Sequence, residues 1–252
     1  MEVLVYIVLM PFLFIFLFVM AYLFRKRKVK KILFSEFDEG EKDLEAREFF
    51  NRIFKLERLY KLFLYIQGIF LIIDTLFILF GGYKTYLEEV EFVKEFSRII
   101  MSPPIKFMVP IIMWVFVFFF IIYVVIMKKK ENKRITEMLD NLENVKHLKF
   151  AKEDFLRSDR ILETGVVGGD IKLGDRYLFS FYPVSIIPYI YIQKMKVKIS
   201  RRGKNGRIYY LDIALKRPFQ KIKIEFAKED VTEKVREFIL ERKKDLNEKI
   251  EY

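Results

Sequence analysis

The stretch from Phe107 to Met127 contains no charged residue, and the basic sequence KKKENKR follows it at once. An apolar run of this length can cross the roughly 30 Å hydrocarbon core of a bilayer as one helix. The whole chain is 53% hydrophobic and yet 32% charged, which suits alternating apolar spans and charged segments better than one globular domain. We therefore predict a membrane protein with a span at about residues 105–127.

Two further apolar runs predict two further spans, at about residues 3–24 and 62–83. Only Glu2 precedes the first run, and the basic sequence RKRKVKK follows it. A cleaved signal peptide would instead carry cations before its apolar region and small residues after it. We therefore interpret the first run as an uncleaved anchor. The Gly81-Gly82 pair at the far end of the second run predicts the end of that helix.

The distribution of Lys and Arg predicts the orientation, because cytoplasmic loops carry an excess of these residues. Residues 25–61 hold twelve of them, whereas residues 84–106 hold four and are balanced by glutamates. The basic cluster after the third span places further Lys and Arg residues on the same side of the membrane as residues 25–61. We expect the N-terminus and the loop 84–104 outside, the loop 25–61 inside, and a multi-pass protein of the cell (inner or plasma) membrane.

The loop 25–61 contains apolar residues near helical spacing, with cations between them. One interpretation is a helical extension that packs on the rest of the protein, and the other is a helix lying in the lipid headgroup layer. The apolar residues are Leu44, Phe49, Phe50, Ile53, Phe54 and Tyr60. We predict that this loop belongs to a membrane region comprising residues 1–134.

Residues 135–252 predict a separate cytoplasmic α+β domain. A helical stripe at its start, including Ile135 and Leu142, is expected to pack on that domain. The segment 192–200 alternates Lys with apolar residues, which is typical of a strand with one wet face. The pair Asn205-Gly206 predicts a hairpin to the strand 207–216. The segment 220–226 alternates again, and a helix from 228 to about 244 closes the chain.

The run GDRYLFSFYPVSIIPYIYIQKMKVKI, Gly174–Ile199, resembles part of the bacterial pleckstrin-homology-like (PH-like) domains. There a Tyr-rich strand is followed by a short strand containing Ile-Pro and then by a long strand. Several uncharacterised prokaryotic membrane proteins are similar, with a few spans followed by such a domain in the cytoplasm. The resemblance implies a PH-like antiparallel sheet closed by a C-terminal helix, and it carries no catalytic residues.

Few residues of the sequence suggest catalysis. The chain has no Cys and a single His, His147, which excludes disulfides, thiolate metal sites and a Cys nucleophile. The run GVVGGD at Gly165–Asp170 lacks the Gly-Lys-Ser/Thr of a phosphate loop and is interpreted as a turn. We expect no enzyme, no cofactor and no metal site, and we interpret His147 as a surface or packing residue.

The strongest remaining signal is positive charge. Residues 128–252 hold thirty Lys and Arg against twenty Asp and Glu. No RNA- or DNA-binding motif accompanies these cations, so nucleic acid is not the expected partner. A domain tethered beside an anionic membrane has lipid headgroups as its nearer partner. The predicted anionic-lipid or partner face comprises Lys194, Lys196, Lys198, Arg201, Arg202, Lys204 and Arg207.

Asp74 is the only ionisable side chain deep in a predicted span. Such residues are costly in lipid and often mark ion paths. Alternatively, Asp74 is structural and forms hydrogen bonds within one protomer or between protomers.

The sequence therefore leaves two functions open. The leading hypothesis is a membrane-anchored, non-enzymatic interaction protein, a scaffold or sensor that associates with the membrane. A second copy of the chain or another membrane protein is a further candidate partner. The alternative is a small transporter or channel subunit that uses Asp74.

Overall fold

The computed structural model describes residues 2–92, 101, 103–166, 169–202 and 206–248. The chain divides into two compact units. The helical unit comprises Met1–Arg25 and Glu57–Lys130, and the sheet unit comprises Lys26–Leu56 and Glu131–Tyr252. The segment 26–56, predicted as a loop of the membrane region, thus clusters with the C-terminal residues.

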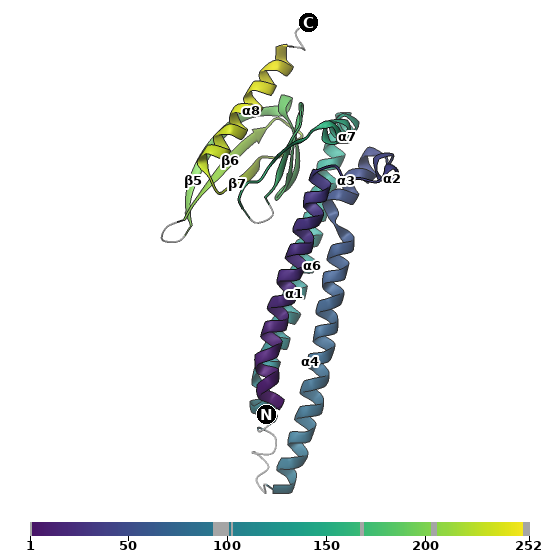
Figure 1. Cartoon of the computed structure of the whole chain (residues 1–252), viewed down its shortest axis with the longest axis vertical. Helices are drawn as coiled ribbons and strands as arrows, with labels where there is room; N and C mark the ends of the chain where they lie inside the picture. The colour runs from purple at the N-terminus through teal and green to yellow at the C-terminus, as the bar shows by residue number, and fades with distance from the viewer. Residues whose placement is uncertain (1, 93–100, 102, 167–168, 203–205, 249–252) are drawn as a thin grey trace. The chain divides into compact units, whose positions relative to one another are not determined.

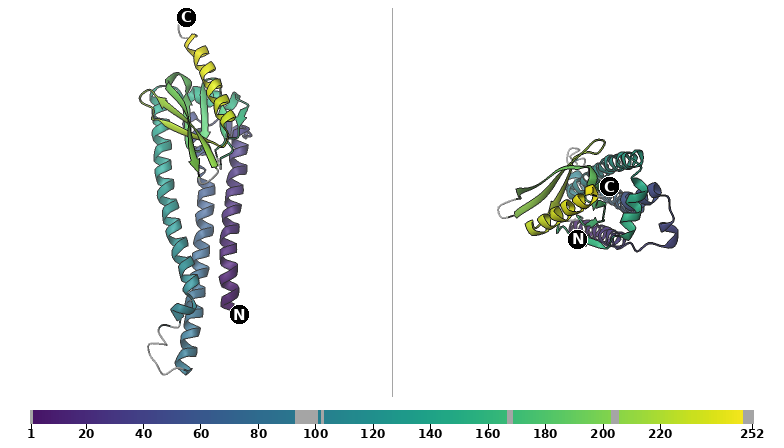
Figure 2. Two further views of the ribbon diagram at one scale, coloured as in Figure 1. Left: turned by 90° about the vertical axis from the view of Figure 1, so that its left-hand side faces the viewer. Right: turned by 90° about the horizontal axis from the view of Figure 1, so that it is seen from above.

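Three long helices contribute to the helical unit and lie side by side in it (Figure 2). They are α1 (Glu2–Leu33), α4 (Glu57–Phe92) and α6 (Met108–Asn144). Phe14 of α1 makes edge-to-face contacts with Phe70 of α4 and with Phe116 of α6. The packing of large rings between the helices holds them together within this unit.

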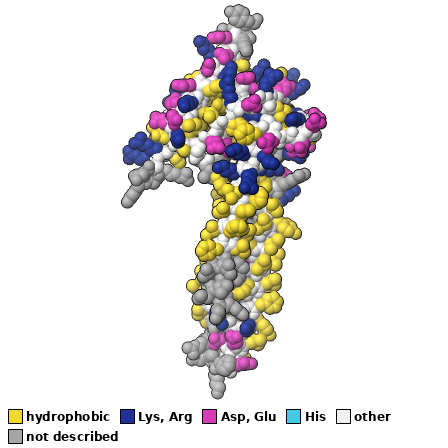
Figure 3. All heavy atoms as spheres, viewed as in Figure 1, with side chains coloured by type: hydrophobic (Ala, Val, Ile, Leu, Met, Phe, Trp, Pro, Cys, Tyr) yellow, Lys and Arg dark blue, Asp and Glu magenta, His cyan; other side chains and the backbone are white. Residues whose placement is uncertain are grey.

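The outer surface of the helical unit is apolar (Figure 3). Ile72 of α4 and Phe119 of α6, for example, are 61% and 63% exposed. Two helices of the described chain are long and apolar enough to cross a membrane, one within Ala46–Glu91 and the other at Met108–Asn144. The chain therefore has a helical N-terminal region with two helices of membrane-spanning length.

The prediction that α4 ends at Gly81-Gly82 is wrong, because the helix continues through both glycines to Phe92. Gly81 serves a different purpose there. A Cβ atom at this position would lie 2.4 Å from the ring of Phe107, so the missing side chain lets that ring approach the helix backbone. The helix α6 is likewise continuous through KKKENKR to Asn144.

The sheet unit contains two antiparallel sheets (Figure 1). Sheet A has the order β1-β2-β3-β4, and sheet B has the order β5-β6-β7. A 3-10 turn, η1 (Tyr189–Tyr191), connects them, and α8 (Glu229–Glu248) ends the chain. The strands are β1 (Arg160–Leu162), β2 (Ile171–Leu173), β3 (Tyr177–Phe181), β4 (Val184–Pro188), β5 (Ile192–Arg202), β6 (Gly206–Leu215) and β7 (Ile222–Phe226).

One face of sheet A forms a core with the helices of the sheet unit. The helices are the ends of α1 and α6, together with α3 (Ala46–Lys55) and α7 (Leu148–Arg157). A further short helix, α2 (Glu39–Lys42), buries no residue. Core residues include Leu33, Phe49, Phe50, Phe54, Leu139, Leu142, Phe155, Tyr177, Phe179 and Phe181. The apolar stripe after the third predicted span therefore packs on the domain, as predicted.

The amphipathic segment of the 25–61 loop also belongs to this core. Phe49, Phe50, Ile53 and Phe54 lie on one face of α3 and are all buried in protein. The helix ends at Leu56, which adopts a left-handed conformation with a φ of 44°. The structure thus supports packing on the protein rather than a helix in the headgroup layer.

The other face of sheet A forms a second core with sheet B and α8. From sheet A it contains Leu178 and Ile187, and from sheet B it contains Leu211 and Ile224. Sheet A is therefore covered on both faces. The helix α8 packs on the same face of sheet B through residues such as Val235, and the opposite face of sheet B is left open.

Asp154 of α7 fixes the turn that joins β2 to β3. Its carboxylate accepts hydrogen bonds from the backbone N–H groups of Asp175, Arg176 and Tyr177, at 2.9, 3.0 and 3.0 Å. Burial raises the pKa of Asp154, and the three N–H donors counteract this effect. A Cβ atom at Gly174 would lie 2.0 Å from the same carboxylate, so this turn requires glycine.

The strands β5, β6 and β7 agree with the predicted segments 192–200, 207–216 and 220–226, whereas β1 and β2 were not predicted. Each of these two strands has only three residues, which is too short to show an alternating pattern. The β5–β6 pairing is antiparallel and in the expected order. The turn residue Asn205 lies outside the described residues.

Candidate functional site

The open face of sheet B brings together side chains from three strands. Cross-strand register places Lys196 of β5 opposite Asp212 of β6, and Asp212 opposite Lys223 of β7. Since side chains two residues apart share a face, Lys194, Lys198 and Lys221 lie on this face as well. We call Lys194, Lys196, Lys198, Lys221 and Lys223 the lysine face.

Asp212 lies beneath the lysine face and is 8% exposed. Its two carboxylate oxygens form ion pairs with lysines from the two neighbouring strands. The Nζ of Lys198 is 2.7 Å from Oδ2, and the Nζ of Lys221 is 3.0 Å from Oδ1. The hydrogen bond from Lys198, followed by that from Lys221, lowers the pKa of Asp212, so the group stays ionised at neutral pH.

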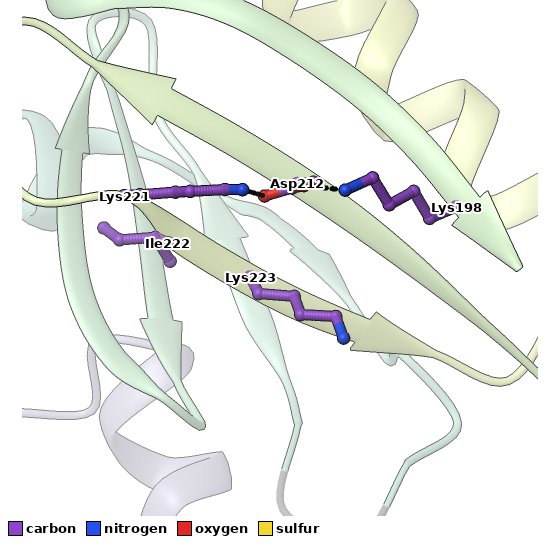
Figure 4. A pocket seen from close by; sticks show the side chains of 5 residues that line it. All are labelled: Lys198, Asp212, Lys221, Ile222 and Lys223. Atoms are coloured by element: carbon purple, nitrogen blue, oxygen red, sulfur yellow. Dashed lines mark ion pairs between the residues drawn. The ribbon is translucent and has the colours of Figure 1, made fainter. Parts of the chain in front are cut away.

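A shallow pocket of about 350 Å³ opens at this position (Figure 4). Lys198 and Lys221 reach Asp212 from opposite sides, and Lys223 lies beside them. The Nζ of Lys223 is 3.5 Å from the ring centroid of Tyr210, a cation–π contact that restrains this long side chain. The pocket is therefore lined by two lysines that are ion-paired with one carboxylate and by a third lysine that an aromatic ring restrains.

The predicted basic residues do not all lie on this face. Lys194, Lys196 and Lys198 do, and they are exposed. Arg201 and Arg207 are paired across the strands but point to the alternate face of sheet B, so they do not extend the lysine face. The backbone of Arg202 ends β5, and Lys204 lies outside the described residues.

The sequence analysis missed Asp212, Lys221 and Lys223 as members of the site. The alternation in 220–226 was visible, but the segment was not combined with the lysines of 192–200. An aspartate within the strand sequence RIYYLDIALK was the available signal, because a carboxylate inside a strand requires a cationic partner or exposure to water.

Asp74 lies in the helical unit and is fully buried on α4. Gln67, two helical turns earlier, is also fully buried, and its amide atoms form no hydrogen bond within the described part of the chain. Close by along α4, the Oγ1 of Thr75 donates to the Leu71 carbonyl and accepts from the indole N–H of Trp114. The structure therefore places two polar groups on the buried side of an apolar helix.

His147 joins α6 to α7 and packs against sheet A. Its Nδ1 lies 2.6 Å from the Tyr177 hydroxyl, and its ring contacts Tyr191 edge to face. Burial, followed by the charge of Arg176, lowers the pKa of His147. These contacts agree with a packing role. The described residues contain no group of three or more His, Asp or Glu side chains placed to hold a metal ion.

Comparison of the chain with protein-family models, with curated proteins and with solved structures finds no match. The geometry of these sites is therefore the basis for inferring a function.

Proposed function

We propose that this chain is a membrane-anchored, non-enzymatic scaffold or sensor whose cytoplasmic domain binds an anionic partner. The observation that carries the proposal is the lysine face, where five exposed lysines surround one buried carboxylate on the open side of sheet B. Anionic lipid headgroups are the partner that lies nearest to a domain tethered to a membrane. Each cation close to an anionic leaflet contributes about 1 kcal/mol, and less at high salt.

The proposal includes three spans in the cell membrane, with the N-terminus outside and the sheet unit in the cytoplasm. Its support is the apolar surface of α4 and α6, the 32 residues of α1, and the bias of Lys and Arg. Because the chain has no Cys, single cysteines can report the orientation. Cys at the exposed Lys84 should react with an impermeant thiol reagent in intact cells, and Cys at the exposed Ser200 should not. The opposite labelling pattern would refute the orientation.

The proposal also includes a PH-like fold for the sheet unit. Its support is the order of the elements, a four-stranded meander followed by a three-stranded meander and a closing helix. The resemblance to bacterial PH-like domains carries no catalytic residues, which agrees with a binding role. The core shared with residues 26–56 and 131–148 means that binding should be tested on the full chain.

The decisive experiment measures the recruitment of vesicles to the full-length protein held in neutral phosphatidylcholine nanodiscs. We expect vesicles that contain phosphatidylglycerol to be recruited at low salt, and pure phosphatidylcholine vesicles not to be. Glu at Lys194, Lys196 and Lys198 should abolish recruitment without unfolding, because these side chains are exposed.

The matched control carries Glu at Lys228, Lys234 and Lys244, which are also exposed but lie on α8 or just before it, away from the lysine face. It changes the net charge by the same amount and should retain most of the recruitment. Equal recruitment of neutral and anionic vesicles would contradict the proposal, as would equal loss in the two triple variants.

The second candidate is a small transporter or channel subunit. Its favouring observation is the burial of both Gln67 and Asp74 on α4, since intramembrane polar groups often mark ion paths. In sealed liposomes, this candidate predicts a proton or cation flux that Asp74→Asn abolishes while the protein stays folded in detergent. Flux no faster than in protein-free liposomes would exclude it.

A further inference from the structure

We infer that Lys198, Lys221 and Lys223 form a binding site for a phosphate group, with Asp212 as the residue that positions the lysines. The inference rests on the proposed function, because it names the ligand chemistry and the residues of the same face. It adds Lys223 of β7 and Lys221, the residue before β7, to the β5 lysines, and it separates a defined site from a general positive charge.

Asp212 solves the main difficulty of a lysine site, which is the conformational freedom of long side chains. Ordering a lysine side chain costs conformational entropy, because its four side-chain torsions become restricted. Here one carboxylate holds the ammonium groups of Lys198 and Lys221 at 2.7 and 3.0 Å before any ligand arrives. Each ammonium group has three N–H donors, so each retains two for a ligand.

The exposed fractions of these side chains determine which of them a ligand can contact. The side chains of Lys198 and Lys221 are 55% and 63% exposed, whereas that of Asp212 is 8% exposed. A ligand approaching from solvent therefore contacts the ammonium groups and not the carboxylate beneath them. The pocket beside them has a volume of about 350 Å³ and is open to solvent.

The charge balance favours a phosphate over a singly charged anion. On this face Lys196, Lys198, Lys221 and Lys223 exceed Asp212 and Glu225 by two positive charges. A phosphate monoester carries about −1.5 to −2 charges near neutral pH and has three strong acceptor oxygens. It can therefore accept from several ammonium groups at once, which a carboxylate ligand with two oxygens does less well. The phosphate can belong to a lipid headgroup or to a soluble molecule.

The experiment titrates inorganic phosphate into the full-length protein in phosphatidylcholine nanodiscs and records binding by calorimetry. We expect saturable binding. Lys221→Gln should weaken it by about tenfold or more, since a charged hydrogen bond is lost. Lys194→Gln removes the same charge from the same face outside the pocket and should change the affinity by no more than about twofold to threefold. Lys221→Arg, which retains charge and donors, should restore most of the binding.

A second arm identifies the source of the phosphate. If the lipid is the ligand, phosphatidic acid vesicles should be recruited, and inorganic phosphate should compete with them. Phosphate binding without vesicle recruitment would support the site with a soluble phosphate ligand and would count against the lipid partner. Vesicle recruitment without phosphate binding, or equal weakening by Lys194→Gln and Lys221→Gln, would overturn the site while leaving the proposed function intact. Absence of both kinds of binding would overturn the two proposals together.

Discussion

Sheet A and sheet B belong to one compact unit, yet they place lysines in opposite environments. Sheet A is covered on both faces, by the helices on one side and by sheet B with α8 on the other. Sheet B is covered on one face only, and its open face carries five lysines. The number of covered faces, rather than the residue type, determines whether a lysine is buried or exposed to solvent.

Lys172 of sheet A illustrates the structural case. It is fully buried, and its Nζ donates to the carbonyl of Leu33 at 2.8 Å and to the hydroxyl of Ser35 at 2.6 Å. The same ammonium lies 4.4 Å from the ring centroid of Phe155. Because Leu33 ends α1, the positive charge sits where the helix dipole is negative. Lys221, just before β7, is by contrast exposed and forms an ion pair with Asp212.

The largest expected loss of stability comes from creating a cavity in the core that covers sheet A. Phe179 is fully buried and touches the rings of Phe50, Phe155 and Tyr177. Phe179→Ala should reduce the free energy of unfolding by about 3–5 kcal/mol. The measurement is urea unfolding of the full chain in detergent, followed by circular dichroism. The exposed control on sheet B, Lys196→Ala, should change it by less than about 0.5 kcal/mol. Similar losses in both variants would remove the distinction between the sheets.

The next effect is the pH dependence of stability that Lys172 produces. Burial lowers the pKa of Lys172 from 10.5 to about 8. Between these two values the unfolded chain binds more protons than the folded one, so stability from this group rises with pH. From pH 8 to pH 10.5 the stability of the wild type relative to Lys172→Met should rise by on the order of 2–3 kcal/mol. A difference that does not vary with pH would contradict the buried environment of Lys172.

The smallest effect concerns the ion pairs of Asp212. The pKa of this carboxyl is lowered, so its contribution to stability is present above its ordinary value of 3.8 and is lost as the pH falls through the folded-state value. The lysines of these pairs are exposed, so the contribution should not exceed about 1 kcal/mol. Asp212→Asn should therefore lower the melting temperature slightly at pH 6 and not at all near pH 2. A loss as large as that of Phe179→Ala would assign Asp212 to the core.

The contrast between the sheets also explains what the sequence could predict. The alternation of Lys and apolar residues in β5 and β7 predicts which side chains are exposed to solvent, because one face of sheet B is open. Sheet A has no wet face, and its Lys172 is indistinguishable in the sequence from a surface lysine. Nothing local indicates that the residue opposite it is the end of α1, since that contact joins positions 139 residues apart.

The same reasoning applies to the predicted site. The lysines of β5 were identifiable from one strand, but the pocket depends on the register between three strands. Asp212 can be recognised as part of the site only once β6 is known to lie between β5 and β7. Arg201 and Arg207, close in sequence to the lysines, fall on the other face because side chains alternate along a strand.

The most direct test of the account is lysine acetylation of the wild-type chain, read by mass spectrometry. The protein is held in nanodiscs of phosphatidylcholine, with and without added vesicles that contain phosphatidylglycerol. The account predicts that the anionic vesicles slow the modification of Lys196, Lys198, Lys221 and Lys223. Lys228 and Lys234, exposed elsewhere on the sheet unit, should react equally in both samples, and the buried Lys172 should stay unreactive throughout. Equal reactivity of the lysine face with and without anionic vesicles would contradict the account.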